Sequence, residues 1–132
     1  MALMTWTAEQ HGTEVKFADD EHKDVFHNLN ILYDLRMEGA SDRKINDQLL
    51  IVLSIVAGHF DHEETAMLAK NFIGYERHKV EHDDLITTCK AMQAKIQLGE
   101  LELTERICQL IKNWFDSHIP EYDRAYAQAL NS

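Results

Sequence analysis

The pattern of apolar and polar positions predicts a long amphipathic helix whose buried face contains polar groups. Over residues 42–68 one stripe of positions three or four apart reads Ile45, Leu49, Val52, Val56, His59, Glu63 and Met67. Steps of three and four place side chains on one face of an α-helix. Charged groups are almost never fully buried unless they are paired or bind a metal. His59 and Glu63 are therefore candidate metal ligands.

The next segment, residues 73–98, has a second stripe of the same kind. Its members keep the three-four alternation and are Tyr75, His78, His82, Leu85, Cys89, Met92 and Ile96. Residues four apart lie on the same side of a helix. His59 with Glu63, and His78 with His82, can therefore each present two ligands to one site.

Five helical segments separated by short loops are expected, at 19–38, 42–68, 73–98, 104–118 and, as a short helix, 120–130. Four long helices joined by short loops pack as an antiparallel, up-down-up-down four-helix bundle. Residues 1–18 lack a sustained period, so we expect an extended N-terminal arm over one end of the bundle. The sequence thus predicts a single all-α domain spanning residues 1–132.

The helix ends are expected at residues with known end preferences. Asp19 and Asp20 should cap the first long helix, and Ser41 and Thr104 should cap the second and the fourth. Short polar side chains accept hydrogen bonds from the free N–H groups of a first helical turn. Gly39 should end the first helix in a left-handed conformation.

The bundle topology predicts which side chains lie at the same height. In an antiparallel helix pair, residues equidistant from the loop are level, because each residue rises about 1.5 Å. Applied to the three loops, this rule brings the candidate ligands into one layer near one end of the bundle. The candidates are His22, His59, Glu63, His78, His82, His118 and Asp123.

His118 and Asp123 need a local irregularity to share a site. Five residues turn an ideal helix by about 500°, which leaves the two side chains about 140° apart. Pro120 lies between them, and proline removes a backbone donor and clashes with the preceding turn. We therefore expect Pro120 to interrupt the helix and to be part of the geometry of the site.

Five imidazoles and two carboxylates are too many ligands for one metal ion. One zinc takes four ligands, so seven fit two metals with bridging carboxylates. Imidazole with carboxylate suits iron, and the lack of usable cysteine ligands argues against soft metals. Carboxylate di-iron oxidases use Glu-x-x-His motifs in a four-helix bundle, and this chain has none. A histidine-rich site stabilises high-valent iron less well, which favours reversible O2 binding.

The composition narrows the possible functions. The chain of 132 residues is 45% hydrophobic and 27% charged, which is typical of a globular domain. Its net charge of −10 argues against nucleic-acid binding, because phosphate contacts need clustered lysine and arginine. The first residues resemble neither a signal peptide nor a spanning segment. Cys89 and Cys108 lack metal-type spacing and are expected to be buried reduced thiols, which favours a cytoplasmic location.

The spacing of the candidate ligands resembles that of a known family. The pattern His22 … His59-Phe60-x2-Glu63-Glu64 … His78-x3-His82 … His118-Ile119-Pro120-x2-Asp123 is similar to the hemerythrins, in particular the single-domain bacterial ones. The resemblance implies two iron ions, bridged by Glu63, Asp123 and an oxo or hydroxo group. It further implies that one iron is held by His78, His82 and His118. The other is then held by His22 and His59 and keeps an open position for O2.

The resemblance also implies an apolar O2 pocket. Candidates for its lining lie one turn from the ligands and are Val25, Phe26, Phe60, Trp114 and Phe115. The family usually has an aliphatic residue such as leucine where Phe115 stands. The other three histidines, His11, His27 and His62, are expected to be ordinary solvated residues.

Several cellular roles are compatible with such a centre. An O2 carrier or store, not an enzyme, is the main hypothesis, with an oxygen-consuming oxidase as a candidate recipient and the chain acting as a monomer. An O2 or redox sensor usually needs an attached output domain. A peroxidase or nitric-oxide scavenger could use the same centre, and iron storage would need a larger cavity.

Overall fold

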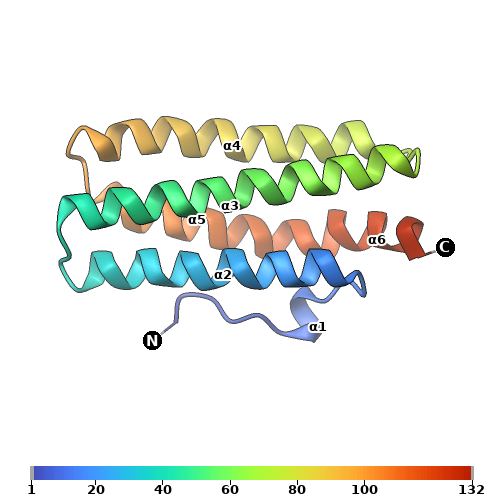
Figure 1. Ribbon diagram of the computed structural model, residues 1–132, viewed down its shortest axis with the longest axis horizontal. Helices are drawn as coiled ribbons and strands as arrows, with labels where there is room; N and C mark the ends of the chain where they lie inside the picture. Colours follow the sequence, from blue (N-terminus) through green and yellow to red (C-terminus); the bar gives the residue numbers. More distant parts are fainter. Residues whose placement is uncertain (1, 132) are drawn as a thin grey trace.

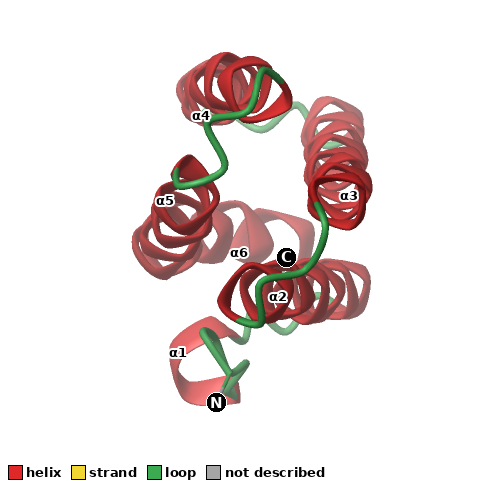
Figure 2. Ribbon diagram, turned by 90° about the vertical axis from the view of Figure 1, so that its left-hand side faces the viewer, coloured by secondary structure: helices red, strands yellow, loops and turns green. Residues whose placement is uncertain are grey.

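Four long antiparallel helices form the bundle that the sequence predicts, as Figure 1 and Figure 2 show from the side and from the end. The computed structural model describes residues 2–131. Its elements are α1 (Ala8–His11), α2 (Lys16–Met37), α3 (Asp42–Ala69), α4 (Tyr75–Gln97), α5 (Leu103–His118), the π-helical turn η1 (Ile119–Asp123) and α6 (Arg124–Asn131). The all-α class and the up-down-up-down order are confirmed.

The apolar stripes of the long helices meet along the axis of the bundle. Ile45, Leu49, Val52 and Val56 of α3 are fully buried. Their neighbours in the core include Leu29 and Leu32 of α2, Leu85 and Ile96 of α4, and Ile107 and Ile111 of α5. Burying one such side chain contributes roughly 1.5–3 kcal/mol. Among residues 2–131, every helix is too short or too polar to cross a membrane.

Two of the predicted helix ends are confirmed. The Ser41 Oγ accepts a hydrogen bond of 3.3 Å from the Lys44 N–H at the start of α3. Gly39 follows the last turn of α2 with φ of 72°, in the left-handed region that glycine adopts without steric cost. Together these residues fix the α2–α3 loop, and with it the height at which the two helices face each other.

The other predicted caps are wrong. α2 begins at Lys16, before Asp19 and Asp20, and its N-cap residue is Val15. Asp19 instead accepts hydrogen bonds from the backbone N–H and the hydroxyl of Thr13, at 2.9 and 2.8 Å. Asp19 therefore ties the preceding loop to the helix rather than capping it.

Thr104 is also not a cap. α5 begins at Leu103 with Glu102 as the N-cap residue. Thr104 is fully buried, and its hydroxyl has no hydrogen-bond partner. Its position on the inner side of the first turn places it in the core, which overrides the preference of threonine for helix ends.

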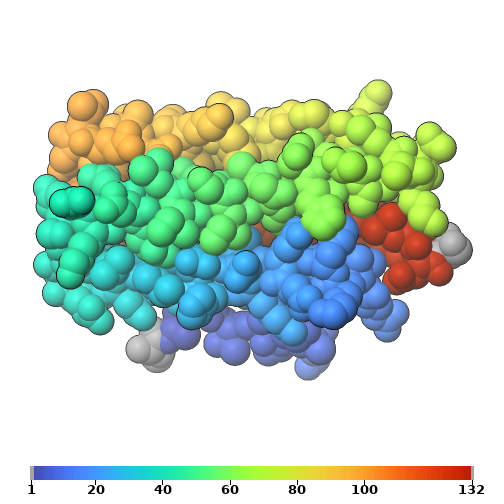
Figure 3. Space-filling model, in the orientation of Figure 1, coloured from blue at the N-terminus to red at the C-terminus, as the bar shows by residue number. Residues whose placement is uncertain are grey.

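The N-terminal arm is neither wholly extended nor placed over the bundle end. It contains the one-turn helix α1 and follows the side of the bundle, next to α2, where Figure 3 shows its side chains. The Thr7 hydroxyl caps α1 by accepting from the Gln10 N–H at 3.2 Å. Side-chain contacts of Asn30 and Arg124 hold the arm to α2 and α6. A short segment without apolar period carries no sequence signal for this docking.

Pro120 widens the last helix rather than breaking it. Residues Ile119–Asp123 form a π-helical turn between α5 and α6, and the Arg124 N–H donates to the Ile119 carbonyl five residues earlier. A turn closed by such a bond brings residues five apart onto one side. The His118 Nε2 and the Asp123 Oδ1 accordingly lie 3.0 Å apart. The expected interruption is therefore a π-bulge.

Replacing Pro120 tests whether this turn positions Asp123. Pro120→Ala restores the missing N–H, so the segment can return to regular α-helix, in which Asp123 would point about 140° away from His118. We expect a longer separation between His118 and Asp123 in a crystal structure and faster loss of bound metal to a chelator. The loss should be smaller than for Asp123→Ala.

Glu121→Ala, at the exposed neighbouring position, is the matched control. Metal retention equal to that of the parent, with Asp123 unmoved in Pro120→Ala, would show that the proline has no part in the geometry.

Candidate metal centre

The structure brings together all seven side chains that the sequence singled out. His22 comes from α2, His59 and Glu63 from α3, His78 and His82 from α4, His118 from α5 and Asp123 from η1. Each of them is at most 3% exposed. They occupy one layer of the bundle because the short loops set the four helices at matching heights.

The seven residues form two groups that share both carboxylates. One group is Glu63, His78, His82, His118 and Asp123, and the other is His22, His59, Glu63 and Asp123. Within each group, one ligand atom per residue lies within 4.8 Å of all the others. Each group could therefore hold one metal ion.

Asp123 spans the two groups with its two oxygens. Its Oδ1 lies 3.0 Å from the Nε2 of both His78 and His118. Its Oδ2 lies 3.1 Å from the Nε2 of His22. Glu63 is shared differently, since its Oε1 lies 3.2 Å from the His82 Nε2 and 3.4 Å from the His59 Nε2.

The spacing of these atoms fits metal coordination. The Nε2 atoms of His78 and His118 are 2.9 Å apart, a distance at which one ring can donate a hydrogen bond to the other or at which both can bind one ion. Ligand atoms at about 2.1 Å from an ion lie about 3.0 Å apart when they are at right angles, and about 3.4 Å apart in a tetrahedron. The separations around Asp123 and between His78 and His118, at 2.9–3.1 Å, are close to the right-angle value. Those of Glu63 from His82 and His59, at 3.2 and 3.4 Å, lie nearer the tetrahedral value.

Several buried polar atoms in the layer lack hydrogen-bond partners. They include the Nε2 atoms of His22, His59 and His82, the Oε1 of Glu63 and both carboxylate oxygens of Asp123. Buried polar groups are almost always paired, and each exception needs an explanation such as an ion. Two cations in the layer would satisfy these six atoms at once, so the donor set fits a pair of metal ions. The Nδ1 atoms of His22, His78 and His118 also lack a partner, and ions bound at the Nε2 atoms would leave them unpaired.

The electrostatics keep both carboxylates ionised. Burial opposes the charged form of Asp123, but His118, His22 and His78 outweigh it and hold the pKa of Asp123 well below its usual range. Glu63 is opposed by burial and by Asp123, yet His59, His82 and His22 still lower its pKa. For His59, Glu63 and Glu21 overcome burial and raise the pKa of the imidazole. Two adjacent buried negative charges are an environment that attracts cations.

Three side chains that the sequence analysis missed support the ligands. The His59 Nδ1 lies 2.7 Å from the Glu21 Oε1, and the His82 Nδ1 lies 2.9 Å from the Glu64 Oε2. Histidine ligands commonly donate their second N–H to a carboxylate, which fixes the ring and directs the other nitrogen at the metal. Glu21 and Glu64 are each next in the sequence to a candidate ligand, which could have indicated this role. Which histidine each of them contacts depends on how the helices pack, and the sequence pattern does not show that.

Tyr126 is the third missed residue. Its hydroxyl donates a 2.6 Å hydrogen bond to the Glu63 Oε2. Burial and the nearby carboxylates of Glu63 and Asp123 raise the pKa of Tyr126, so it stays a neutral donor. This bond fixes the carboxylate that both groups share.

The predicted pocket residues divide between the two sides of the cluster. Phe60 stacks on His82 at 3.8 Å between ring centroids, and Trp114 stacks on His118 at 3.9 Å. Phe115 lies beside the other group, 5.8 Å from His22 and 6.5 Å from His59. Phe26 packs behind Phe115 at 6.0 Å, and Val25 is fully buried in the core.

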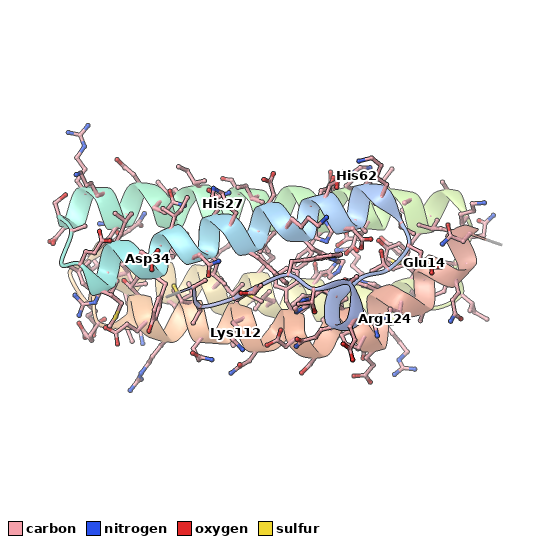
Figure 4. The ribbon with its side chains drawn as sticks, turned by 90° about the horizontal axis from the view of Figure 1, so that it is seen from below. Glu14, His27, Asp34, His62, Lys112 and Arg124 are labelled. Carbon is pink, nitrogen blue, oxygen red and sulfur yellow. The ribbon has the colours of Figure 1, made fainter. Side chains whose placement is uncertain are left out.

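The three remaining histidines differ from each other. His27 is exposed as expected. His62 has a half-exposed side chain, visible at the surface in Figure 4, but its Nδ1 lies 2.6 Å from the Glu21 Oε2. The expectation for His11 is wrong, because it is 2% exposed and contacts Asp116. Its burial comes from the docking of α1, which the sequence pattern does not indicate.

Sequence comparison agrees with the geometry of the cluster. Residues 13–130 match the Hemerythrin HHE cation binding domain. A bacteriohemerythrin of Methylococcus capsulatus is 39% identical over 132 residues, which cover the whole of both chains. A myohemerythrin of Sipunculus nudus is 25% identical over 108 residues, covering 82% of this chain and 78% of that one.

Solved structures extend the similarity to the fold. A crystal structure of wild-type hemerythrin has a TM-score of 0.93 at 39% identity and covers 99% of this chain and 100% of that one. Three variants of a hemerythrin, with one leucine replaced by phenylalanine, tyrosine or alanine, have TM-scores of 0.94 and cover all of both chains. The phenylalanine variant is 40% identical and the other two are 39% identical. Because the family model matches residues 13–130 and a bacteriohemerythrin is 39% identical over the whole of both chains, this chain belongs to the hemerythrin family.

Proposed function

We propose that the chain binds O2 reversibly at a pair of iron ions held by these seven residues. The observation that carries the proposal is the unequal number of histidines in two groups that share Glu63 and Asp123. His78, His82 and His118 serve one ion, and His22 and His59 serve the other. If an oxo or hydroxo group joined the two ions, the three-histidine ion would have six ligands and the other would have five. The ion held by His22 and His59 would then have one position free for O2.

The side chains around the cluster have roles that suit such a centre. The iron pair supplies the electrons and the coordination position for O2. Glu21 and Glu64 orient the rings of His59 and His82 through their Nδ1 atoms, and Tyr126 holds Glu63. These contacts fix the orientation of the imidazoles and of the carboxylate, so that their free atoms would be directed at the ions.

Aromatic rings pack on the two-histidine side. Phe115 is fully buried and lies 5.8 Å from His22 between ring centroids. Phe26 is 2% exposed and packs behind Phe115 at 6.0 Å. Cleavage of the O–O bond needs a proton donor at the reacting oxygen, whereas an apolar wall excludes water. This lining supports an O2 carrier or store over a peroxidase or nitric-oxide scavenger.

The state of the cysteines bears on the cellular setting. Both cysteines are free and buried, and burial raises the pKa of each thiol to about 12, which keeps them unreactive. The absence of a disulfide between them supports our proposal of a cytoplasmic location. We further propose that the chain acts as a monomer and exchanges O2 with an oxygen-consuming oxidase. The charge of −10 supports a role without nucleic acid.

Phe115 is proposed to set how fast O2 reaches the open position. Among the three solved variants, identity to this chain is highest when the substituted residue is phenylalanine, which supports Phe115 as its counterpart. A phenylalanine fills more space than a leucine, so it closes the pocket more fully.

Phe115→Leu should therefore speed both association and dissociation of O2, and should shorten the life of the reduced state by admitting water. Stopped-flow spectroscopy of the anaerobically reduced protein measures the rates. Tyr33→Leu, in a part of the core away from the cluster, is the matched control. Unchanged rates in Phe115→Leu would mean that this ring does not line the O2 path.

Reversibility separates a carrier from an oxidase or scavenger. We expect the reduced protein to gain the visible absorption of its oxygenated form in air and to lose it under argon through several cycles. Because the rings of Phe26 and Phe115 exclude water from this side, O2 should leave unchanged. If the absorption forms once and the protein then stays oxidised while peroxide accumulates, the carrier function is wrong.

A further inference from the structure

The buried His11 is held in one orientation by two hydrogen bonds. Its Nδ1 lies 3.1 Å from the Thr7 backbone nitrogen, which can only donate. The Nδ1 therefore accepts, and the Nε2 of the neutral ring carries the proton that it donates to the Asp116 Oδ1 at 3.1 Å. Asp116 is fixed in turn by Lys112 at 2.8 Å. The His11 ring is therefore held by hydrogen bonds to Thr7 in the arm and to Asp116 in α5.

A second contact sets the register of the arm along α2. The Asn30 side-chain amide accepts from the Met4 N–H and donates to the Met4 carbonyl, both at 2.8 Å. Met4 is 4% exposed and belongs to the core. Figure 4 shows the arm running between α2 and α5, with Lys112 on the α5 side. This clamp aligns the arm so that His11 meets the bundle at a fixed place.

His11, which is 2% exposed, lines a surface hollow. The hollow has a volume of about 260 Å³, and its lining includes Met4, Thr5, Gln10, His11, Lys112 and Asp116. On the inner side of His11, its ring meets the ring of Phe26 edge-on at 4.8 Å. Phe26 meets Phe115 at 6.0 Å, and Phe115 meets His22 at 5.8 Å. A line of rings therefore connects the hollow with the two-histidine side of the cluster.

Other hollows lead to the opposite group of ligands. One of about 290 Å³ is lined by Trp114, Tyr122 and His118. Another of about 160 Å³ is lined by Phe60, Ile86 and His82. Both end at imidazoles of the three-histidine group, which has no open position in the proposed function.

We propose that the ring of His11 is a movable barrier to O2 between the hollow and the rings of Phe26 and Phe115. The inference rests on the proposed function, because it assumes that O2 must reach the His22 and His59 side. O2 passes when the bond between His11 and Asp116 opens and α1 lifts. A one-turn helix is only marginally stable by itself, so this segment can open while the four long helices stay packed.

A movable barrier changes rates without changing affinity. His11→Ala removes the ring, so the association and dissociation rate constants for O2 should both rise by the same factor, about tenfold for a barrier lowered by about 1.4 kcal/mol. The O2 affinity should stay that of the parent. A substitution that merely loosened the cluster would alter the affinity or the absorption spectrum. Stopped-flow and flash-photolysis measurements on the iron-loaded protein give both constants.

Three further variants sharpen the comparison. His11→Phe keeps a ring against Phe26 but loses both hydrogen bonds, so its rate constants should lie between those of the parent and those of His11→Ala. His27→Ala removes an exposed histidine, and Ile86→Ala enlarges the hollow at Phe60; both should leave the rate constants unchanged. Equal rate constants in His11→Ala and the parent would overturn the proposal, as would a faster Ile86→Ala or a His11→Phe as fast as His11→Ala.

Xenon is apolar and can occupy cavities that admit O2. The positions of bound xenon in crystals of the iron-free protein therefore test the proposed O2 path. Metal-free crystals of His11→Ala under xenon pressure should bind xenon between the hollow and Phe115, where the parent binds less. Xenon only beside Phe60 and Ile86, or none along the Phe26 path, would refute the movable barrier. If the iron-loaded parent fails to bind O2 reversibly, the proposed function is wrong, and the xenon sites still decide whether His11 closes this path.

Discussion

The structure depends on burying two carboxylates and five imidazoles in one layer of a helical bundle. Asp123 and Glu63 are fully buried beside each other, and two such charges strongly disfavour folding unless cations or hydrogen bonds compensate them. The imidazoles alone leave several of the buried atoms unpaired. Bound metal therefore contributes to the stability of the fold as well as to its chemistry, since ions that bind only the folded chain stabilise it.

Irregular features of the fold follow from this constraint. The π-helical turn at Ile119–Asp123 departs from regular helix and directs Asp123 at both groups. Glu21 and Glu64 occupy partly exposed positions, yet each holds the ring of a buried histidine. The arm contributes through His11, which covers the aromatic wall next to Phe115. Regular apolar packing forms the rest of the bundle, where polar ligands are absent.

The ligand layer could be predicted because histidines and carboxylates interrupt apolar stripes, and because helical rise relates heights in neighbouring antiparallel helices. His22, level with His59, is the clearest case, with 4.6 Å between the two ring centroids. The burial of His11 could not be predicted, because it depends on the tertiary contact with Asp116 and not on a local period. The π-bulge was anticipated only as an interruption at Pro120, since proline constrains the backbone without specifying the resulting turn.

We propose that seven side chains hold two iron ions in two groups joined by Glu63 and Asp123. Anomalous X-ray diffraction at the iron absorption edge, on crystals of the iron-loaded protein, tests this arrangement directly. We expect two peaks inside the layer, one nearest His78, His82 and His118 and the other nearest His22 and His59, with Asp123 between them. A single peak, or peaks outside this layer, would contradict it.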